Sequence, residues 1–330
     1  MSRRAVIQSV GHGLPEKIFT NADLIREKNI ESDDEWIVQR TGIQQRHLCT
    51  GDEGAHSLAI MAGREALDRS GLKPTDIEMV IVGTVSGDYI WPSTACFVQS
   101  ALGLKNAGAF DVSAACAGFI YSLANATGLI ETGVIDHALV IGVDALSKQI
   151  DWSDRSTCIL FGDAAAAVVV SGVDGGDRGV IKTVMLADGN GAQFISIDLG
   201  GTKYPPNCVA PEGLKYGIQM MGNEVYRFAI NSMGDACEKV LAEAGVDASE
   251  VDLFVPHQAN SRIITAAAAR FKFPSAKVFV NVHKYGNTSG GSIPLALYEA
   301  SDSGRLKPGM LVLTVGFGAG LVWGANLIRW

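Results

Sequence analysis

Short apolar runs alternate along the chain with longer segments that have a helical pattern. The short runs are rich in Val, Ile, Leu and Ala, and their near-continuous hydrophobicity predicts buried strands of a sheet covered on both faces. Alternation of this kind predicts an α/β protein. The predicted strands lie at 79–85, 138–143, 164–171 and 311–315. The predicted helices lie at 57–70, 116–131, 223–244, 261–271 and 291–303.

The two halves of the chain carry the same order of predicted elements. Residues 55–120 and 223–303 each predict a helix, a strand, a helix, a second strand and the start of another helix. We therefore expect a duplicated α/β unit, with halves at 1–173 and 174–330 and a site between them. The segment 174–215, with its Gly-Gly and Pro-Pro pairs, is expected to join the halves and add an excursion. The second strands of the two halves are expected at 109–112 and 277–281.

Composition narrows the class of protein. The 330 residues are 47% hydrophobic and 19% charged, which is typical of a globular protein with a large core. The net charge is −8 and no basic run is present, so nucleic acid is not an expected partner. The six cysteines form no CxxC pair, which disfavours a zinc site or disulfide framework and favours a reducing cytoplasm. The longest apolar run, 164–170, is far below the roughly 20 residues of a membrane span.

Cys116 is the first candidate for chemistry. It follows a predicted strand and a turn of small residues, and it begins a long apolar helix. A thiol at a helix N-terminus experiences the positive end of the helix dipole, which favours the thiolate. The small neighbours leave room for a substrate. An inert buried cysteine is the alternative explanation.

Two polar residues in the second half could act with this thiol. His257 lies between a predicted strand and a predicted helix, where ligand crevices of open α/β sheets form; a structural histidine is the alternative. Asn287 lies in a Gly-Asn-Thr-Ser-Gly-Gly turn, where a fixed amide is a good hydrogen-bond donor. The turn at 316–320 could offer backbone N–H groups to an oxyanion. A phosphate loop is disfavoured here, because such a loop is followed by a helix and this turn is not. No other histidine has metal-ligand spacing, so no metal is expected.

The chain order Cys, His, Asn is also that of papain-like proteases. Those enzymes carry a C-G-S-C-W type signature near the mature N-terminus. Here the context is Ala-Ala-Cys-Ala-Gly, well inside the chain and after a strand. This context and the duplicated α/β pattern disfavour a hydrolase.

Long segments along nearly the whole chain match one known family. They lie at 20–24, 34–43, 110–118, 161–164, 222–225, 255–260, 286–289 and 316–324. In them the chain resembles the thiolase-fold condensing enzymes, and specifically the β-ketoacyl-acyl-carrier-protein synthase III family, which starts type II fatty-acid synthesis. The resemblance implies two α/β halves packed in αβαβα layers. Thiolases use a second Cys in the late glycine-rich turn, where this chain has Gly318-Ala319-Gly320. Elongating synthases use two histidines, and this chain has Asn287 at the position of the second. Both differences favour the initiating class.

The resemblance assigns a role to each candidate. Cys116 would take the acyl group of an acyl-CoA, and malonyl-acyl-carrier-protein would then lose CO₂ to give an enolate. His257 and Asn287 would donate hydrogen bonds to the enolate oxygen. Backbone N–H groups of Cys116 and Ala319 would form the oxyanion hole, with Ala319 where the family often has Gly. No cofactor is implied, since acyl-CoA is a substrate.

The same resemblance implies binding residues for CoA. Trp36 and Arg155 would sandwich the adenine ring. Arg40 would contact the nucleotide phosphates, and Asn223 and Asn260 the pantetheine arm. Trp36 and Arg40 lie four apart on a predicted helix, so a surface pair without a ligand is the alternative.

The resemblance also implies protein partners and a homodimer. Arg227, Arg262 and Arg270 would dock the acidic carrier protein. In the turn before Pro92, Trp91 from the second subunit would close the acyl pocket, and its bulk favours a short primer. Two alternatives remain open: a similar condensing enzyme of secondary metabolism with another acyl donor or acceptor, and a non-catalytic thiolase-fold binding protein. The intact Cys/His/Asn set disfavours the second.

Overall fold

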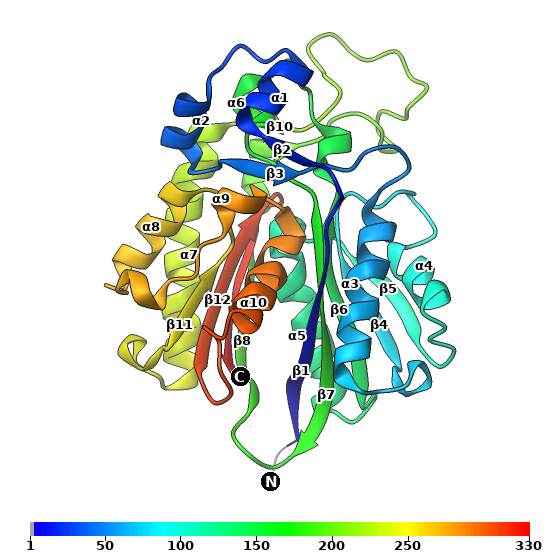
Figure 1. Ribbon diagram of the computed structural model, residues 1–330, viewed down its shortest axis with the longest axis vertical. Helices are drawn as coiled ribbons and strands as arrows, with labels where there is room; N and C mark the ends of the chain where they lie inside the picture. The colour runs from blue at the N-terminus through cyan, green and yellow to red at the C-terminus, as the bar shows by residue number, and fades with distance from the viewer. Residues whose placement is uncertain (1–2) are drawn as a thin grey trace.

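Two β-sheets stand side by side in the computed structural model, which describes residues 3–330, with helices between them and on both outer sides (Figure 1). The first sheet has the order β1-β7-β6-β4-β5 and the second β11-β12-β13-β8. The first comprises β1 (Arg3–Gly13), β4 (Met79–Gly83), β5 (Gly108–Val112), β6 (His137–Asp144) and β7 (Ala164–Asp174). The second comprises β8 (Gly179–Ala187), β11 (Leu253–Pro256), β12 (Leu311–Gly318) and β13 (Val322–Arg329).

Two apolar helices fill the space between the sheets. In α5, Phe119, Ile120 and Leu123 are fully buried, and α10 is buried along most of its length. A helix that is apolar on nearly all sides needs cover on all sides, which only a central layer supplies. The result is the expected five-layer αβαβα arrangement of the thiolase-like fold. The central helices are α5 (Gly118–Glu131) and α10 (Ser292–Asp302); the outer ones are α3 (Ala55–Ser70) and α4 (Thr94–Ala101) on the first sheet and α7 (Gly222–Ala244) and α8 (Ser261–Arg270) beside the second.

The two sheets share one connection pattern. In the first, β4 pairs parallel with β5 and β6, and β6, β7 and β1 then continue antiparallel. In the second, β11 pairs parallel with β12, and β12, β13 and β8 continue antiparallel. We propose that residues 1–173 and 174–330 are the two copies of a duplicated unit.

The fifth place in the second sheet is almost empty, so the predicted strand at 277–281 is wrong. Only Val278 pairs there, through one parallel bridge to Phe254. The Arg305 guanidinium donates to the carbonyl oxygens of Ala276 and Val278 at 2.8 and 3.3 Å. The Arg305 side chain thus satisfies two carbonyl oxygens of this segment, and the pairing of the segment with β11 is limited to the one bridge.

The segment 174–215 contains a strand that the sequence pattern did not reveal. β8 forms the edge of the second sheet and buries Val180 and Val184. Lys182 and Thr183 interrupt the strand, so the continuous apolar run that marked the central strands is absent here. After β8 the chain forms η4 (Gly189–Phe194) and the short strand β9 (Ile195–Ser196), which pairs with β10 (Gln219–Met220).

A cap of short elements covers one end of the two sheets (Figure 1). Its centre is the fully buried Arg46, which donates to Asn21 Oδ1 at 2.9 Å and to the Ile159 carbonyl at 2.8 Å. Burial lowers the pKa of this guanidinium to about 10, so it stays charged at neutral pH. The cap elements are β2 (Ile18–Thr20), α1 (Asn21–Lys28), α2 (Asp34–Thr41), β3 (Gln45–His47), α6 (Arg155–Cys158) and α9 (Val282–Tyr285). Within residues 3–330, no helix has both the length and the apolar character to cross a bilayer.

Gly83 and Gly118 set the distance between the first sheet and α5. A Cβ at Gly83 would lie 2.5 Å from the Gly118 carbonyl carbon. We predict that Gly83→Ala lowers the free energy of unfolding by about 1–3 kcal/mol through overpacking. Gly128→Ala, at an exposed α5 position with no heavy atom within 4 Å, should instead raise it by about 0.5–1 kcal/mol. Urea unfolding of both variants measures this, and a neutral Gly83→Ala would refute the close contact.

Candidate active site

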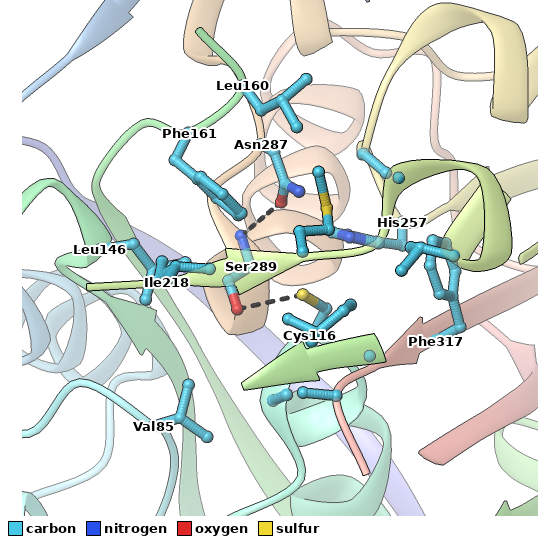
Figure 2. Close-up of a pocket in the computed structure, with 18 of the residues that line it drawn as sticks. Val85, Cys116, Leu146, Leu160, Phe161, Ile218, His257, Asn287, Ser289 and Phe317 are labelled. Carbon is cyan, nitrogen blue, oxygen red and sulfur yellow. Dashed lines mark hydrogen bonds between the residues drawn. The ribbon is translucent and has the colours of Figure 1, made fainter. Parts of the chain in front are cut away.

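The predicted catalytic residues from both halves of the chain meet in one apolar cavity of about 410 Å³. Cys116 enters from the first half, and His257, Asn287 and Ala319 enter from the second. Figure 2 shows the thiol, the imidazole and the amide pointing toward a common space. Leu146, Phe161 and Ile218 form an apolar wall on one side. The arrangement suits an acyl group held beside a nucleophile and two hydrogen-bond donors.

Cys116 lies in a 3-10 turn, Ala115–Ala117, that directly precedes α5. Its Sγ lies 3.2 Å from Ser289 Oγ (Figure 2). Burial raises the pKa of the Cys116 thiol to about 12, opposed by the Ser289 hydrogen bond and reinforced by the nearby Asp144 carboxylate. The expectation that the helix N-terminus would favour the thiolate is therefore wrong for the free protein, because desolvation of the charged form is the larger effect.

His257 is held rigidly at the end of β11. Its backbone N–H donates to the Val315 carbonyl at 2.7 Å, and the Phe317 ring packs edge-to-face on the imidazole at 5.5 Å. Nδ1 lies 2.8 Å from Ser292 Oγ. Burial lowers the pKa of the imidazole to about 3. His257 is therefore neutral at physiological pH, and it faces the cavity as an uncharged group.

Asn287 is tied to the first half of the chain by its backbone. Its N–H donates to the Leu160 carbonyl at 2.9 Å, and its carbonyl accepts from Gly162 N–H at 3.0 Å. The side-chain Oδ1 accepts from Ser289 N–H at 3.0 Å (Figure 2). With the oxygen engaged, the NH₂ group is the end of the amide that can donate to a ligand.

Ala319 lies in the turn between β12 and β13 and lines the cavity beside Cys116. The preceding glycine allows this approach, since a Cβ at Gly318 would lie 2.6 Å from the Cys116 nitrogen. The turn thus brings backbone groups of the second half next to the nucleophile. A backbone donor at 319 does not depend on the side chain, so Ala in place of Gly preserves it.

The proposed adenine sandwich is not open in this structure. The guanidinium carbons of Arg155 and Arg40 both lie 4.7 Å from the centre of the Trp36 ring. A planar base between Trp36 and Arg155 needs about 7 Å, two contact distances of roughly 3.5 Å. Arg155, which also donates to the Glu31 carbonyl at 2.8 Å, must move before a base can enter. Trp36 and Arg40 form a cation–π pair within α2.

The two asparagines expected at the pantetheine arm differ in position. Asn260 lines the cavity, and its Oδ1 caps α8 by accepting from Ile263 N–H at 2.9 Å. That cap leaves its NH₂ group to face a ligand. Asn223 is exposed in the first turn of α7, next to the cavity-lining Gly222.

The three arginines expected at a carrier-protein surface are engaged differently. Arg270 donates to Asp235 and Glu238 at 2.8 and 2.9 Å, so it joins α8 to α7. Arg227 is more exposed than Arg270, and its guanidinium pairs with Glu224 at 2.9 Å. Arg262 lies over the Tyr226 ring at 5.4 Å, and Tyr226 lines the cavity. Arg262 thus contacts a side chain that lines the cavity.

Trp91 does not contribute to the cavity of its own chain. It is 82% exposed, and with Tyr89 and Ile90 it forms an exposed apolar turn. None of these three side chains lines the cavity.

Two serines beside the predicted catalytic residues have no signal in the sequence. Ser289 contacts the thiol and Ser292 contacts the imidazole. Their segment has the composition of a turn, and serines in turns ordinarily bond to nearby backbone. Only the position of the turn against both halves reveals that their hydroxyl groups face the reacting side chains.

Comparisons with known proteins agree with this fold. The family model described as 3-oxoacyl-[acyl-carrier-protein (ACP)] synthase III matches residues 110–189, and its C-terminal model matches 241–330. A β-ketoacyl-[acyl-carrier-protein] synthase III from Caldanaerobacter subterraneus subsp. tengcongensis is 46% identical, covering 99% of this chain and 98% of its own.

Solved structures show the same similarity. The crystal structure of 3-oxoacyl-[acyl-carrier-protein] synthase III from Aquifex aeolicus VF5 is 43% identical with a TM-score of 0.90, covering 99% of this chain and all of that chain. The priming β-ketosynthase of the R1128 polyketide pathway is 34% identical with a TM-score of 0.91, covering 99% and 96% of the two chains.

The fold and the thiol-centred site therefore define an acyltransferase of the condensing class. Within that class, the chain belongs to the 3-oxoacyl-[acyl-carrier-protein] synthase III family, which confirms the resemblance drawn from the sequence.

The Ser289 hydroxyl should control the reactivity of the Cys116 thiol. A hydrogen bond to a thiolate is worth about 1.5 kcal/mol or more, so we predict that Ser289→Ala slows iodoacetamide alkylation of Cys116 about tenfold at pH 8. Because burial raises the pKa of the thiol to about 12, the wild-type rate should still rise with pH up to about pH 10. Mass spectrometry of the Cys116 peptide measures both rates.

Ser289 has a φ of +48°, so Ser289→Gly serves as a second variant that removes the hydroxyl without adding backbone strain. Ser232→Ala, a buried serine whose hydroxyl bonds only within α7, is the matched control. Unchanged alkylation in both Ser289 variants, or a wild-type plateau near pH 8, would contradict this assignment.

Proposed function

We propose that this enzyme joins a short acyl-CoA primer to malonyl-acyl-carrier-protein by decarboxylative condensation, through an acyl group carried on Cys116. The observation that carries the proposal is the meeting of one thiol with two neutral donors, His257 and Asn287, in an apolar cavity. A neutral imidazole and an amide stabilise a developing enolate without supplying a competing nucleophile.

In the first half-reaction, Cys116 sulfur attacks the thioester carbonyl of the primer. The bond between the carbonyl carbon and the CoA sulfur breaks, and the proton of the Cys116 thiol leaves with CoA as its free thiol. Backbone N–H groups of Cys116 and Ala319 hold the oxyanion of the tetrahedral intermediate. The apolar walls exclude water, which protects the acyl-enzyme from hydrolysis.

In the second half-reaction, malonyl-acyl-carrier-protein replaces CoA. The carboxylate leaves as CO₂, and its electron pair forms an enolate whose oxygen accepts hydrogen bonds from His257 Nε2–H and the Asn287 amide. The enolate carbon attacks the acyl-Cys116 carbonyl. The Cys116 thiolate that leaves takes up one proton from solvent, and the 3-oxoacyl product stays on the carrier protein.

The binding roles extend this proposal. Trp36, Arg40 and Arg155 would hold the nucleotide of CoA once Arg155 has moved, with Asn223 and Asn260 along the pantetheine arm. The functional unit would be a cytoplasmic homodimer in which the exposed Trp91 turn of one subunit closes the acyl cavity of the other and favours short primers. No cofactor enters the chemistry.

A role in secondary metabolism, with a different donor or acceptor, is the alternative. The curated relatives at 42–46% identity carry the name β-ketoacyl-[acyl-carrier-protein] synthase III, whereas the polyketide priming synthase is 34% identical. The higher similarity favours fatty-acid initiation.

Cys116→Ser should abolish labelling of the protein by radiolabelled acetyl-CoA, because an alcohol in this apolar site is a far weaker nucleophile than a thiol. Cys96→Ser, which alters an exposed cysteine, should label like the wild type. Full labelling of Cys116→Ser would show that Cys116 is not the nucleophile.

Condensation should require malonyl-acyl-carrier-protein and should proceed faster with acetyl-CoA than with a C8 primer. A preference for malonyl-CoA over malonyl-acyl-carrier-protein would favour the alternative function.

Carrier-protein docking should depend on Arg262. Arg262→Glu is predicted to raise KM for malonyl-acyl-carrier-protein about tenfold, since a rim charge steers an acidic partner, and to leave labelling by acetyl-CoA unchanged. Arg270→Gln should lower the free energy of unfolding with little effect on that KM, because its guanidinium joins two helices. Steady-state kinetics with both acyl acceptors checks this. Equal KM effects from both variants would disprove the distinction.

A further inference from the structure

Ser292 occupies a buried position between the imidazole and the backbone. It is the first residue of α10 and is 1% exposed. Its Oγ lies 2.8 Å from the backbone nitrogen of Gln258 and 2.8 Å from Nδ1 of His257. His257 and Gln258 are equally buried, so water does not compete for these groups.

The proton positions follow from the number of donors and acceptors. The Gln258 N–H can only donate, so Ser292 Oγ accepts from it. The hydroxyl has one proton of its own, and Nδ1 of His257 is the acceptor that the geometry provides for it among residues 3–330. A hydrogen on Nδ1 would instead give the oxygen two incoming donors and leave its own proton without this partner.

We propose that Ser292 is a positioning residue that holds His257 in the Nε2–H tautomer, so that the imidazole serves the reaction as a hydrogen-bond donor and not as the base for Cys116. The inference rests on the proposed function for its catalytic meaning. The tautomer itself is a property of the resting protein.

The tautomer decides which half-reaction His257 can assist. With Nε2–H toward the cavity, the ring can donate to an enolate oxygen. The opposite tautomer would present a lone pair to that oxygen and repel it. Burial lowers the pKa of the imidazole to about 3, so the doubly protonated ring, which would donate from either nitrogen, is not available near neutral pH.

The backbone beside Ser292 is fixed from the opposite half of the chain. Gly290 N–H donates to Asp144 Oδ2 at 2.9 Å, and a Cβ at Gly291 would lie 2.5 Å from the Ala164 carbonyl oxygen. The start of α10 thus has little freedom to shift relative to β6 and β7. Ser292 therefore meets the imidazole in a defined place, as the orienting group of a catalytic pair must.

The direct test is nitrogen NMR of the whole enzyme labelled with ¹⁵N-histidine, with the His257 signals identified by their loss in His257→Ala. We expect Nε2 to carry the proton and Nδ1 to be unprotonated from pH 5 to pH 8. A proton on Nδ1 in the wild type would overturn the inference, whether or not any variant folds.

Kinetics of three variants complete the test. Ser292→Ala should lower the rates of malonyl decarboxylation and condensation at least tenfold and change labelling of Cys116 by acetyl-CoA less than about threefold. Ser292→Thr, which keeps a hydroxyl, should restore the tautomer and part of the rate. Ser232→Ala, which changes a buried serine that does not line the cavity, should leave all rates unchanged.

The outcomes separate this inference from the proposed function. A Ser292→Ala protein that keeps Nε2–H and the full decarboxylation rate overturns the positioning role. Equal losses in labelling and in decarboxylation also overturn it, since they indicate a general structural effect. A wild-type enzyme that shows Nε2–H and acetyl labelling but never condenses contradicts the proposed function, and with it the catalytic meaning of the tautomer.

Discussion

The site depends on one buried carboxylate that bonds to both halves of the chain. Asp144, at the end of β6, accepts from Thr84 Oγ1, Val85 N–H and Ser86 Oγ of the first half and from Gly290 N–H of the second. Burial raises the pKa of this carboxyl, and hydrogen bonds from Ser289, Val85, Ser86 and Gly290 oppose the shift. A buried charge without such partners would be very costly. The contact therefore fixes the 287–292 turn, and with it Asn287, against the half that carries Cys116.

Burial also determines how the site can work. It raises the pKa of the thiol and lowers that of the imidazole, so both groups are uncharged before substrate arrives. A thiolate–imidazolium pair, the usual arrangement of cysteine proteases, is disfavoured in such a cavity. Two neutral groups suit a reaction in which negative charge appears only on the substrate oxygen. In the proposed reaction, fixed donors would stabilise the enolate more than the ground state, as catalysis requires.

The sequence predicted the central strands, the main helices and the meeting of Cys116, His257 and Asn287, because buried strands and family motifs leave strong local signals. It did not predict that the pairing of 277–281 would stop at one bridge, because Phe254 and Arg305, the partners of this segment, are distant in the sequence. The predicted direction of the shift in the thiol pKa was wrong, because desolvation depends on what covers Cys116 and not on its place before a helix. Ser289 and Ser292 were missed because their partners come from other elements.

Different segments of the chain hold the cysteine and histidine in place and bound the space for the acyl chain. Close glycine contacts join Gly83 to Gly118 and Gly142 to Gly290, so the reacting groups have almost no freedom to separate. Short, irregular segments around β9 and β10 form another wall, which Ile197 and Ile218 line. The two strands there pair over only two residues each, so little regular backbone hydrogen bonding holds this wall. Substitutions there change the space for an acyl chain without moving Cys116 or His257. Primer preference can therefore change within this frame while the condensation chemistry is retained.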